Sequence, residues 1–359
     1  MKLLDRYIFF QFLTTYLFTV LILVLVICVI DYSEKSDDFI KNAVPLSEIL
    51  FDYYINFILH LATLITPLLV FIATVFITAR LAGRTEWIAM LSSGVSFRRL
   101  LVPYFAGATL IGIFSFYLGG WVVPDANKER IAFEVRYIKK PYSFDERNFH
   151  SRVGENVYAY MQSYNNQTHT GRYFSLEKII NHQIIEKLQA DVITWDTARR
   201  SWHLENYVIH YFDGEKEKLK EGRDLDTLIA LQPKDFESKH RYYETLTFPE
   251  LENYISTQQQ RGRIQDLGIY YVEKFQRYAS PFSILVLTLL GVAVSSRKTR
   301  QGTSFQIALG FILAFVFLIF VIISRSLGQS GSYPPEIVAF LPNITFGLVA
   351  FYLYKKAPK

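Results

Sequence analysis

Long apolar runs separated by short charged loops dominate the hydropathy pattern of this chain. The first run, residues 7–30, is interrupted only by Gln11 and a few threonines. At about 1.5 Å per residue it can cross a bilayer core of about 30 Å, and it lacks the small-residue cleavage site of a signal peptide. We therefore predict six membrane-spanning helices. Their apolar runs are residues 7–30, 55–78, 100–123, 281–296, 305–324 and 337–354.

Lysines and arginines in the short loops predict which way the helices run. Positive residues next to a span stay on the cytoplasmic side. They gather at both ends of the chain and after the second and fourth runs, whereas residues 31–52 carry six acidic residues against two lysines. We therefore expect both termini in the cytoplasm and residues 31–52 outside it. The residues that set this orientation are Lys2, Arg6, Arg80, Arg84, Arg98, Arg99, Arg297, Lys298, Arg300, Lys355, Lys356 and Lys359.

Residues 125–271 form a long polar segment between the third and fourth spans, large enough to be a domain and expected outside the cytoplasm. Stretches rich in β-branched and aromatic residues alternate in it with turn-forming Asn, Asp and Gly. Trp195 and Trp202 flank one turn and are expected to pair across the hairpin. Several short antiparallel strands predict an all-β domain, a sandwich or a jelly roll. The predicted strands are residues 156–164, 172–180, 189–195 and 202–212.

A helix start is indicated at Thr247, with Pro249 in the first turn, and polar residues continue through Gln260 to a break at Gly262. This helix is expected to link the β-domain to the fourth span. The predicted organisation is therefore three spans, an inserted domain and three spans. Its parts are residues 1–124, with a short cytoplasmic helix within 84–94, residues 125–262, with the β-domain and linker helix, and residues 263–359.

The basic loop of residues 80–99 contains that short predicted helix. Thr85 is expected to cap its N-terminus, and Glu86, as its first residue, meets the positive end of the helix dipole. Gly94 is expected to end the helix in a left-handed turn, because glycine adopts that backbone conformation without a steric cost. The sequence thus predicts one short amphipathic helix between two spans.

One face of this helix carries Trp87, Met90 and Leu91, which fall at i, i+3 and i+4. Such spacing of aromatic and apolar anchors is typical of a helix that docks in a groove on a partner protein. An ordinary surface helix, with arginines that serve only to set membrane orientation, fits the same pattern. Both interpretations stay open at this level.

The composition fits a membrane protein, with 51% hydrophobic and 16% aromatic residues. The net charge of +5 is spread over loops beside apolar runs rather than gathered in one patch, so we exclude nucleic-acid binding. The single cysteine, Cys28, lies within the first apolar run, which excludes an internal disulfide and a Cys-based metal site.

Enzyme signatures are missing from the sequence. The chain has no Gly-x-x-x-x-Gly-Lys-Ser/Thr phosphate loop, so it should not hydrolyse ATP by itself, and no His-Glu-x-x-His motif. Residues 328–331 resemble a nucleophile elbow but lack its second glycine. His60 could serve an intramembrane hydrolase together with a serine, but a lone polar residue in a span more often bonds to a neighbouring helix. We expect no catalytic, metal-binding or cofactor-binding residue.

Two charged residues at the outer ends of spans are candidates for contact with a lipid headgroup. Lys35 lies four residues after Asp31, and a helical ion pair worth a few tenths of a kcal/mol is one explanation for it. Alternatively, its ammonium meets an anionic headgroup, because it lies past the apolar run and can reach the interface. Arg325, at the outer end of the fifth span, has the same two interpretations.

Short motifs along the whole chain follow a consistent order and spacing. They are Leu4-Asp5-Arg6-Tyr7-Ile8, Arg84-Thr85-Glu86 with Ser93-Gly94, Trp121-Val122-Val123-Pro124, Thr194-Trp195-Asp196 with Trp202, Pro334-Pro335 and Leu341-Pro342-Asn343. Together they resemble the LptF/LptG (YjgP/YjgQ) permeases of the ABC-type lipopolysaccharide exporter. The Leu-Asp-Arg-Tyr start and the Trp-flanked hairpin are more similar to LptG.

This resemblance implies a permease subunit without catalysis of its own, in the inner membrane of a Gram-negative cell. It would pair with a paralogous LptF or LptG permease above two LptB ATPase subunits, which would use ATP and Mg²⁺. The helix after the second span would dock on LptB, with Glu86 as an acidic contact. The residues of this coupling helix are Arg84, Thr85, Glu86, Trp87, Met90 and Leu91.

The resemblance also implies a path for the lipid. Lipopolysaccharide would enter between spans one and five of the two permeases, near Lys35 and Arg325, and the periplasmic jelly roll would pass it to an LptC-type protein. The alternative is a non-transporting, membrane-anchored assembly or scaffold protein that presents a β-domain. Charge reversal at Glu86 separates the two, because only the transporter depends on that residue for coupling.

Overall fold

The computed structural model describes residues 3–138, 147–213, 216–236, 241–261, 267–296 and 303–356. Cα packing divides the chain into two compact units, a helical unit and a sheet unit. The helical unit comprises residues 1–138, 241–252 and 267–359, and the sheet unit comprises residues 139–240 and 253–266. Some predictions lie outside the described residues: the orienting charges Lys2, Arg297, Lys298, Arg300 and Lys359, and the helix break at Gly262.

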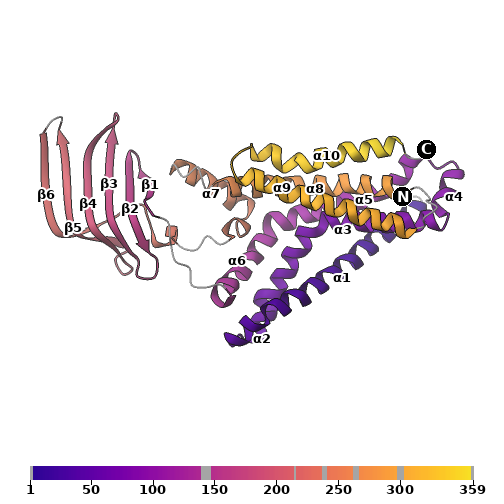
Figure 1. The fold of residues 1–359 in the computed structure, drawn as a ribbon, viewed down its shortest axis with the longest axis horizontal. Coiled ribbons are helices and arrows are strands. Elements are labelled where there is room, and N and C mark those ends of the chain that lie inside the picture. The colour runs from indigo at the N-terminus through magenta and orange to yellow at the C-terminus, as the bar shows by residue number, and fades with distance from the viewer. Residues whose placement is uncertain are drawn as a thin grey trace. The chain divides into compact units, whose positions relative to one another are not determined.

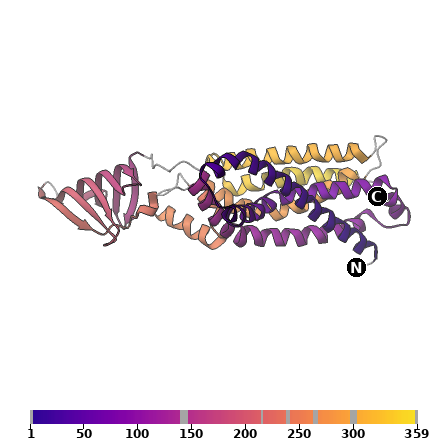
Figure 2. The ribbon, with the colours of Figure 1, turned by 90° about the horizontal axis from the view of Figure 1, so that it is seen from below.

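The predicted six spans are confirmed, because six helices of the described chain are long and apolar enough to cross a membrane. In the helical unit α8 is central and packs against four of the other five long helices, all except α1 (Figures 1 and 2). The six are α1 (Leu3–Lys41), α3 (Ile55–Gly83), α5 (Phe97–Tyr117), α8 (Gly268–Ser295), α9 (Thr303–Gln329) and α10 (Pro335–Lys355).

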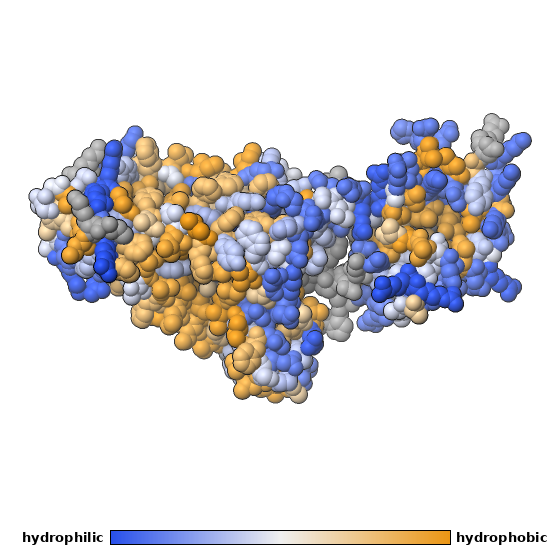
Figure 3. Space-filling view, turned by 180° about the vertical axis from the view of Figure 1, so that it is seen from behind, coloured by the Kyte–Doolittle hydropathy of each residue, from blue (hydrophilic) through white to orange (hydrophobic). Residues whose placement is uncertain are grey.

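Helix α1 packs along one side only. Near its start Phe12 is fully buried, and a Cβ added at Gly107 of α5 would lie 2.6 Å from the Phe12 ring, so the two helices approach closely there. Farther along, Leu17, Phe18 and Leu21 are each 63% exposed. Figure 3 shows hydrophobic side chains gathered on the surface of the helical unit. This apolar face suits contact with lipid chains or with another membrane helix.

Residues 125–138 were predicted to begin the β-domain, and the structure corrects this boundary. They are helical and belong to the helical unit, where Arg130, Ile131 and Phe133 are buried. The segment looks like a loop in the sequence because it is rich in charged residues, of which Arg130 and Glu134 pair with each other inside the unit. The connecting elements here are α2 (Leu46–Glu48), η1 (Ile49–Tyr54), η2 (Leu118–Val122), α6 (Val123–Phe133) and η3 (Glu134–Ile138).

The sheet unit confirms the inserted all-β region and the four predicted strands. The six strands in its described residues run antiparallel in one sheet with the order β1 to β6, which is a meander, whereas the predicted jelly roll has crossovers. Trp195 pairs with Trp202 as predicted, with ring centroids 5.2 Å apart. The first and last strands were not predicted. The strands are β1 (Phe149–Gly154), β2 (Val157–Asn165), β3 (Thr170–Ile180), β4 (Gln183–Asp196), β5 (Ser201–Asp213) and β6 (Lys216–Thr227).

One face of the sheet carries the core of this unit. Trp202 is fully buried, and its indole N–H donates to the carbonyl of Leu231 at 2.8 Å. Phe236, at the end of η4 (Pro233–Phe236), stacks on Tyr164 with ring centroids 3.9 Å apart. The segment after β6 therefore covers part of the apolar face.

The predicted linker helix is confirmed as α7 (Phe248–Gln260), which follows η5 (Tyr242–Glu244). Thr247 precedes it, and the Glu250 carboxylate accepts hydrogen bonds from the Thr247 backbone N–H and hydroxyl, both at 2.8 Å. This is the reciprocal half of a capping box, in which the third helical residue reaches back to the cap.

Candidate functional site

The short helix predicted between the second and third spans is α4 (Glu86–Ser92), and Glu86 is its first residue as expected. It lies at the end of the helical unit where both chain termini lie (Figure 1). The predicted cap is wrong: the Thr85 hydroxyl donates to the Arg84 carbonyl and caps nothing. Thr85 has φ 64° because its N–H still bonds to the end of α3, at Ala82, while its carbonyl already accepts the first bond of α4.

The predicted end of α4 is confirmed. Gly94 has φ +88°, and its N–H donates to the Leu91 carbonyl at 3.0 Å. The next residue, Val95, donates to the Met90 carbonyl at 3.3 Å. These two bonds form a Schellman motif, which satisfies the last carbonyls of the helix and turns the chain into α5.

Trp87, Met90 and Leu91 do share a face of α4, but that face points into this chain rather than toward a partner. Trp87 is fully buried, with its ring 5.9 Å from Phe97, and the other two pack on the same core. Burial in the unit's own core removes Trp87 as a contact for another protein. The exposed side of α4 carries Ile88, Ala89 and Ser92 instead.

Polar contacts tie this end of the unit together. The Glu86 carboxylate accepts a hydrogen bond from the Tyr7 hydroxyl of α1 at 3.2 Å and lies 3.9 Å from the Arg84 guanidinium. Arg99 of α5 pairs with the buried Asp5 of α1 at 2.5 Å. Side-chain contacts therefore join α4 to α1 and α5, and an ion pair joins those two helices to each other.

Lys35 lies near the other end of α1. Its ammonium is 2.7 Å from the Asp31 carboxylate, hydrogen-bonds the Tyr53 hydroxyl and lies 4.5 Å from the Tyr53 ring centre. The predicted helical ion pair is therefore confirmed. The Lys35 side chain is 21% exposed. Contact of Lys35 with a lipid headgroup stays a prediction.

A group of buried charges lies at the end of the helical unit away from α4. The Arg130 side chain is 1% exposed and binds Glu134 at 2.9 Å and Glu244 at 3.0 Å. Its Nε–H also donates to the Asn127 side-chain carbonyl at 3.0 Å. The ring of His60 in α3 hydrogen-bonds Asn127 of α6 at 3.1 Å, which is the interhelical contact favoured for it from the sequence. Buried charges persist only when paired in this way.

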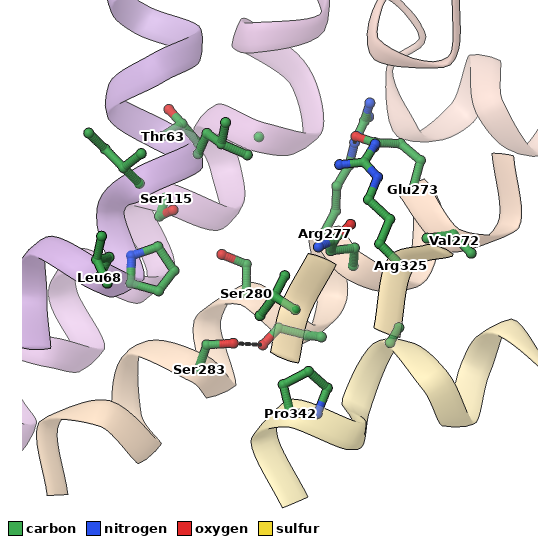
Figure 4. Close-up of a pocket in the computed structure, with 18 of the residues that line it drawn as sticks. Thr63, Leu68, Ser115, Val272, Glu273, Arg277, Ser280, Ser283, Arg325 and Pro342 are labelled. Atoms are coloured by element: carbon green, nitrogen blue, oxygen red, sulfur yellow. Dashed lines mark hydrogen bonds and ion pairs between the residues drawn. The ribbon is translucent and has the colours of Figure 1, made fainter. Parts of the chain in front are cut away.

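A second group centres on Glu273 of α8. Its two carboxylate oxygens bind Arg277 at 2.9 Å and Arg325 of α9 at 3.1 Å, and Figure 4 shows the three side chains together. Arg277 also donates to the carbonyls of Leu246 and Tyr243. Arg325 lies over the Tyr243 ring, 5.6 Å from its centre. Arg325 therefore forms an ion pair within the helical unit, although with a residue of another helix. Its contact with a lipid headgroup stays a prediction.

These charges border a cavity of about 410 Å³ inside the helical unit (Figure 4). Helices α3, α5, α8, α9 and α10 contribute most of its wall. Leu68, Phe317 and Pro342 make much of the wall apolar, whereas Thr63 and Ser115 face it from α3 and α5. The site therefore combines an apolar volume with a charged rim.

Comparison with known families settles what kind of protein carries these features. A family model described as lipopolysaccharide export system permease LptF/LptG matches residues 6–356. The chain belongs to the LptF/LptG permease family. No curated protein matched the chain. The family description covers both permeases and does not distinguish LptG from LptF. The chain is thus a multi-pass membrane protein and a permease subunit of lipopolysaccharide export.

Two motifs that carried the resemblance have structural roles in this permease. Asn343 of α10 accepts a hydrogen bond from the Ser283 hydroxyl at 2.6 Å and donates to the Ala279 carbonyl at 2.8 Å, which joins α10 to α8. Trp121 lies with its ring centre 5.3 Å from Phe248, at the start of α7. Both motifs hold helices together near the cavity.

The polar face of α8 was not predicted from the sequence. Five polar residues make up this face, and all five line the cavity. The predicted apolar run begins only at Pro281, whereas α8 begins at Gly268. The signal lay in the spacing i, i+3, i+4, i+7 and i+10, which puts polar residues on one face of a helix. These residues are Glu273, Gln276, Arg277, Ser280 and Ser283.

Proposed function

We propose that the permease extracts lipopolysaccharide from the inner membrane, driven by ATP hydrolysis in a partner subunit. The family match carries this proposal, because residues 6–356 include all six spans, α4 and the sheet. In this arrangement both termini and α4 are cytoplasmic and the sheet is periplasmic. The proposed partners are an LptB-type ATPase pair, a paralogous LptF or LptG permease and an LptC-type protein that receives the lipid from the sheet.

Helix α4 is the proposed contact with the ATPase. Its exposed residues Ile88, Ala89 and Ser92 form a small, mostly apolar surface, and the charges of Arg84 and Glu86 lie beside it. Docking of such a face into a groove buries apolar area while flanking charges set the orientation. Because the Trp87 packing and the Glu86–Tyr7 hydrogen bond join α4 to the long helices, closure of the ATPase pair would move those helices.

The lipid is proposed to meet the exposed apolar face of α1. Lys35 lies near the end of that helix with its side chain 21% exposed, and it is the proposed contact for an anionic headgroup. Arg325 is a second headgroup candidate, and its place beside a cavity limits which headgroups fit it.

Co-purification tests this proposal. A tagged chain is isolated in mild detergent, its companions are identified by mass spectrometry and ATP hydrolysis of the eluate is measured. We expect an ABC-type ATPase and a paralogous permease with the wild type, and loss of the ATPase with Glu86→Lys and with Ala89→Arg. Glu336→Lys, at an exposed position in the first turn of α10, is the matched control and should retain it.

The scaffold alternative predicts a different pattern. The chain would then purify without an ATPase, or an ATPase would remain bound to both α4 variants. Either result, obtained with variants that elute as monodisperse protein, contradicts the exporter proposal and leaves only the fold in common with the family.

A further inference from the structure

The cavity of the helical unit contains polar atoms without partners. Ser115 is 5% exposed, and its hydroxyl oxygen has no hydrogen-bond partner among the described residues. The side-chain carbonyl oxygen of Gln276 is likewise buried without a partner. The hydroxyl of the nearby Thr63, in contrast, donates a hydrogen bond to the Leu59 backbone carbonyl, four residues earlier in the helix, as helical hydroxyls commonly do. Buried polar groups are rarely left unpaired, so these two atoms indicate a ligand group in the cavity.

The charges at the rim are unequal. Arg277 and Arg325 share the single carboxylate of Glu273. For Arg325 the structure records one acceptor, on one terminal nitrogen, although a guanidinium carries five N–H donors. Arg277 directs its remaining terminal nitrogen atoms to backbone carbonyls. Arg277, Arg325 and Glu273 together therefore carry one excess positive charge, which we assign to Arg325.

The neighbouring charges do not supply the missing anion. Arg130 is held by Glu134 and Glu244. Arg241 also binds Glu244, at 2.8 Å. These two arginines therefore share two carboxylates, and within the described part of the unit Arg325 forms an ion pair with Glu273 alone. An anionic ligand group would balance the excess charge.

The shape of the cavity suits one apolar chain. Its volume of about 410 Å³ falls in the range of roughly 300–1,000 Å³ that is typical of small-molecule sites. Leu64 of α3 and Ile322 of α9 border it, and each is 58% exposed on the apolar surface of the unit. The cavity is therefore reached from the surface that faces lipid, and it is too small for the several acyl chains of lipopolysaccharide.

We propose that this cavity binds a lysophospholipid, a single-chain amphiphile with an anionic phosphate and a free hydroxyl. Its acyl chain would lie among Leu68, Phe317 and Pro342, and its phosphate would pair with Arg325. Its hydroxyl would donate to Gln276, and Ser115 would donate to a headgroup oxygen. The ligand would connect α3, α5, α8 and α9 within one subunit, and it takes Arg325 in place of the lipopolysaccharide headgroup considered for that residue above.

Photo-crosslinking of the purified complex tests the site. The probe is lysophosphatidylglycerol with a photoreactive acyl chain, and crosslinked peptides are identified by mass spectrometry. We expect saturable crosslinks to the cavity-lining parts of α3 and α9. A monoacylglycerol of the same chain length, which lacks the phosphate, should compete at least tenfold more weakly than unlabelled lysophosphatidylglycerol.

Two variants distinguish the contribution of the ligand's headgroup to binding from that of its acyl chain. Arg325→Gln should weaken binding about tenfold, because it removes the excess charge, and Ser280→Phe should abolish saturable crosslinking by filling the cavity. Arg98→Gln, at an exposed position on the far end of α5, should bind as the wild type does. Equal binding by Arg325→Gln, equal competition by monoacylglycerol, or crosslinks confined to α1 would each overturn the proposal.

If wild-type protein of normal thermal stability shows no saturable crosslinking, the cavity contains water alone. That result would also overturn the lysophospholipid proposal. Failure of the exporter proposal has a separate signature. Loss of ATPase co-purification leaves the crosslinking result unchanged, because the two experiments read different surfaces of the unit.

Discussion

The two ends of the helical unit differ in the packing and the charge of their interiors. At the α4 end the interior is mostly apolar and filled, apart from the Asp5–Arg99 ion pair: Trp87 and Tyr104 are fully buried, and Phe97 is 4% exposed. At the other end the interior contains the buried Arg130, its carboxylate partners and a cavity of about 410 Å³. One bundle of helices therefore has a solid end and a hollow, charged end.

This difference indicates a division of labour. Close-packed apolar side chains transmit displacement because they leave no room to relax, which suits an end that receives a mechanical input. Buried ion pairs and cavities are poor sources of stability, since desolvation offsets much of the attraction between the charges. A protein that keeps them at one end gains recognition of polar or ionic ligands there, at a cost in stability.

The largest effect that tests this contrast is expected at Arg130. Arg130→Leu leaves Glu134 and Glu244 buried without their main partner, so we expect the unfolding free energy to fall by roughly 3–5 kcal/mol. Denaturation of the purified protein in detergent measures it. Arg136→Leu is the matched control, because its side chain is 67% exposed and its loss should cost less than about 1 kcal/mol. Similar losses for the two variants would contradict the ionic account of the hollow end.

Trp87 tests the solid end. Trp87→Ala removes a fully buried indole, and we expect it to destabilise the protein by about 3 kcal/mol through the cavity left behind. Trp87→Phe should cost less than about 1.5 kcal/mol, because it keeps most of the apolar contact and removes an indole N–H that has no acceptor among the described residues. A cost for Trp87→Ala no larger than that of the exposed Ile88→Ala would show that α4 is not held by its buried face.

The turn after α4 gives the smallest expected effect. Gly94→Ala forces a residue with a Cβ into the left-handed region at φ +88°, with a cost of about 1–2 kcal/mol from backbone strain alone, because no atom lies within 4 Å of the added Cβ. Gly119→Ala is the control, since its added Cβ makes only an ordinary contact at 3.7 Å with Thr63. The same thermal unfolding curves compare them. An unchanged unfolding temperature for Gly94→Ala would contradict the turn geometry.

The sequence predicts elements well where hydrophobic patterning decides them. All six spans, the four central strands and the Trp195–Trp202 hairpin pair follow from apolar runs and turn residues. Strand β6 could not be found in this way, because eight of the twelve residues of Lys216–Thr227 are charged and backbone pairing with β5 holds the strand in place. Edge strands need no apolar face, and charges on them are common.

The functional residues were harder to predict because their partners are distant in the chain. The spacing of Trp87, Met90 and Leu91 identified a real helix face, but spacing alone does not reveal that this face packs on Phe97 of its own subunit. Arg325 was identified from its charge, whereas its partner Glu273 is 52 positions away. Periodicity shows which residues share a face, and only the tertiary fold shows what that face meets.

The central claim is that α4 couples ATP hydrolysis to lipid export, and lipid release measures it most directly. The co-purified complex is placed in vesicles that contain lipopolysaccharide, and transfer of lipopolysaccharide to a soluble acceptor is followed with and without ATP. We expect ATP-dependent transfer by the wild type and by Glu336→Lys, and a loss of at least tenfold with Ala89→Arg. Transfer that needs no ATP, or that continues unchanged with Ala89→Arg, would contradict the claim.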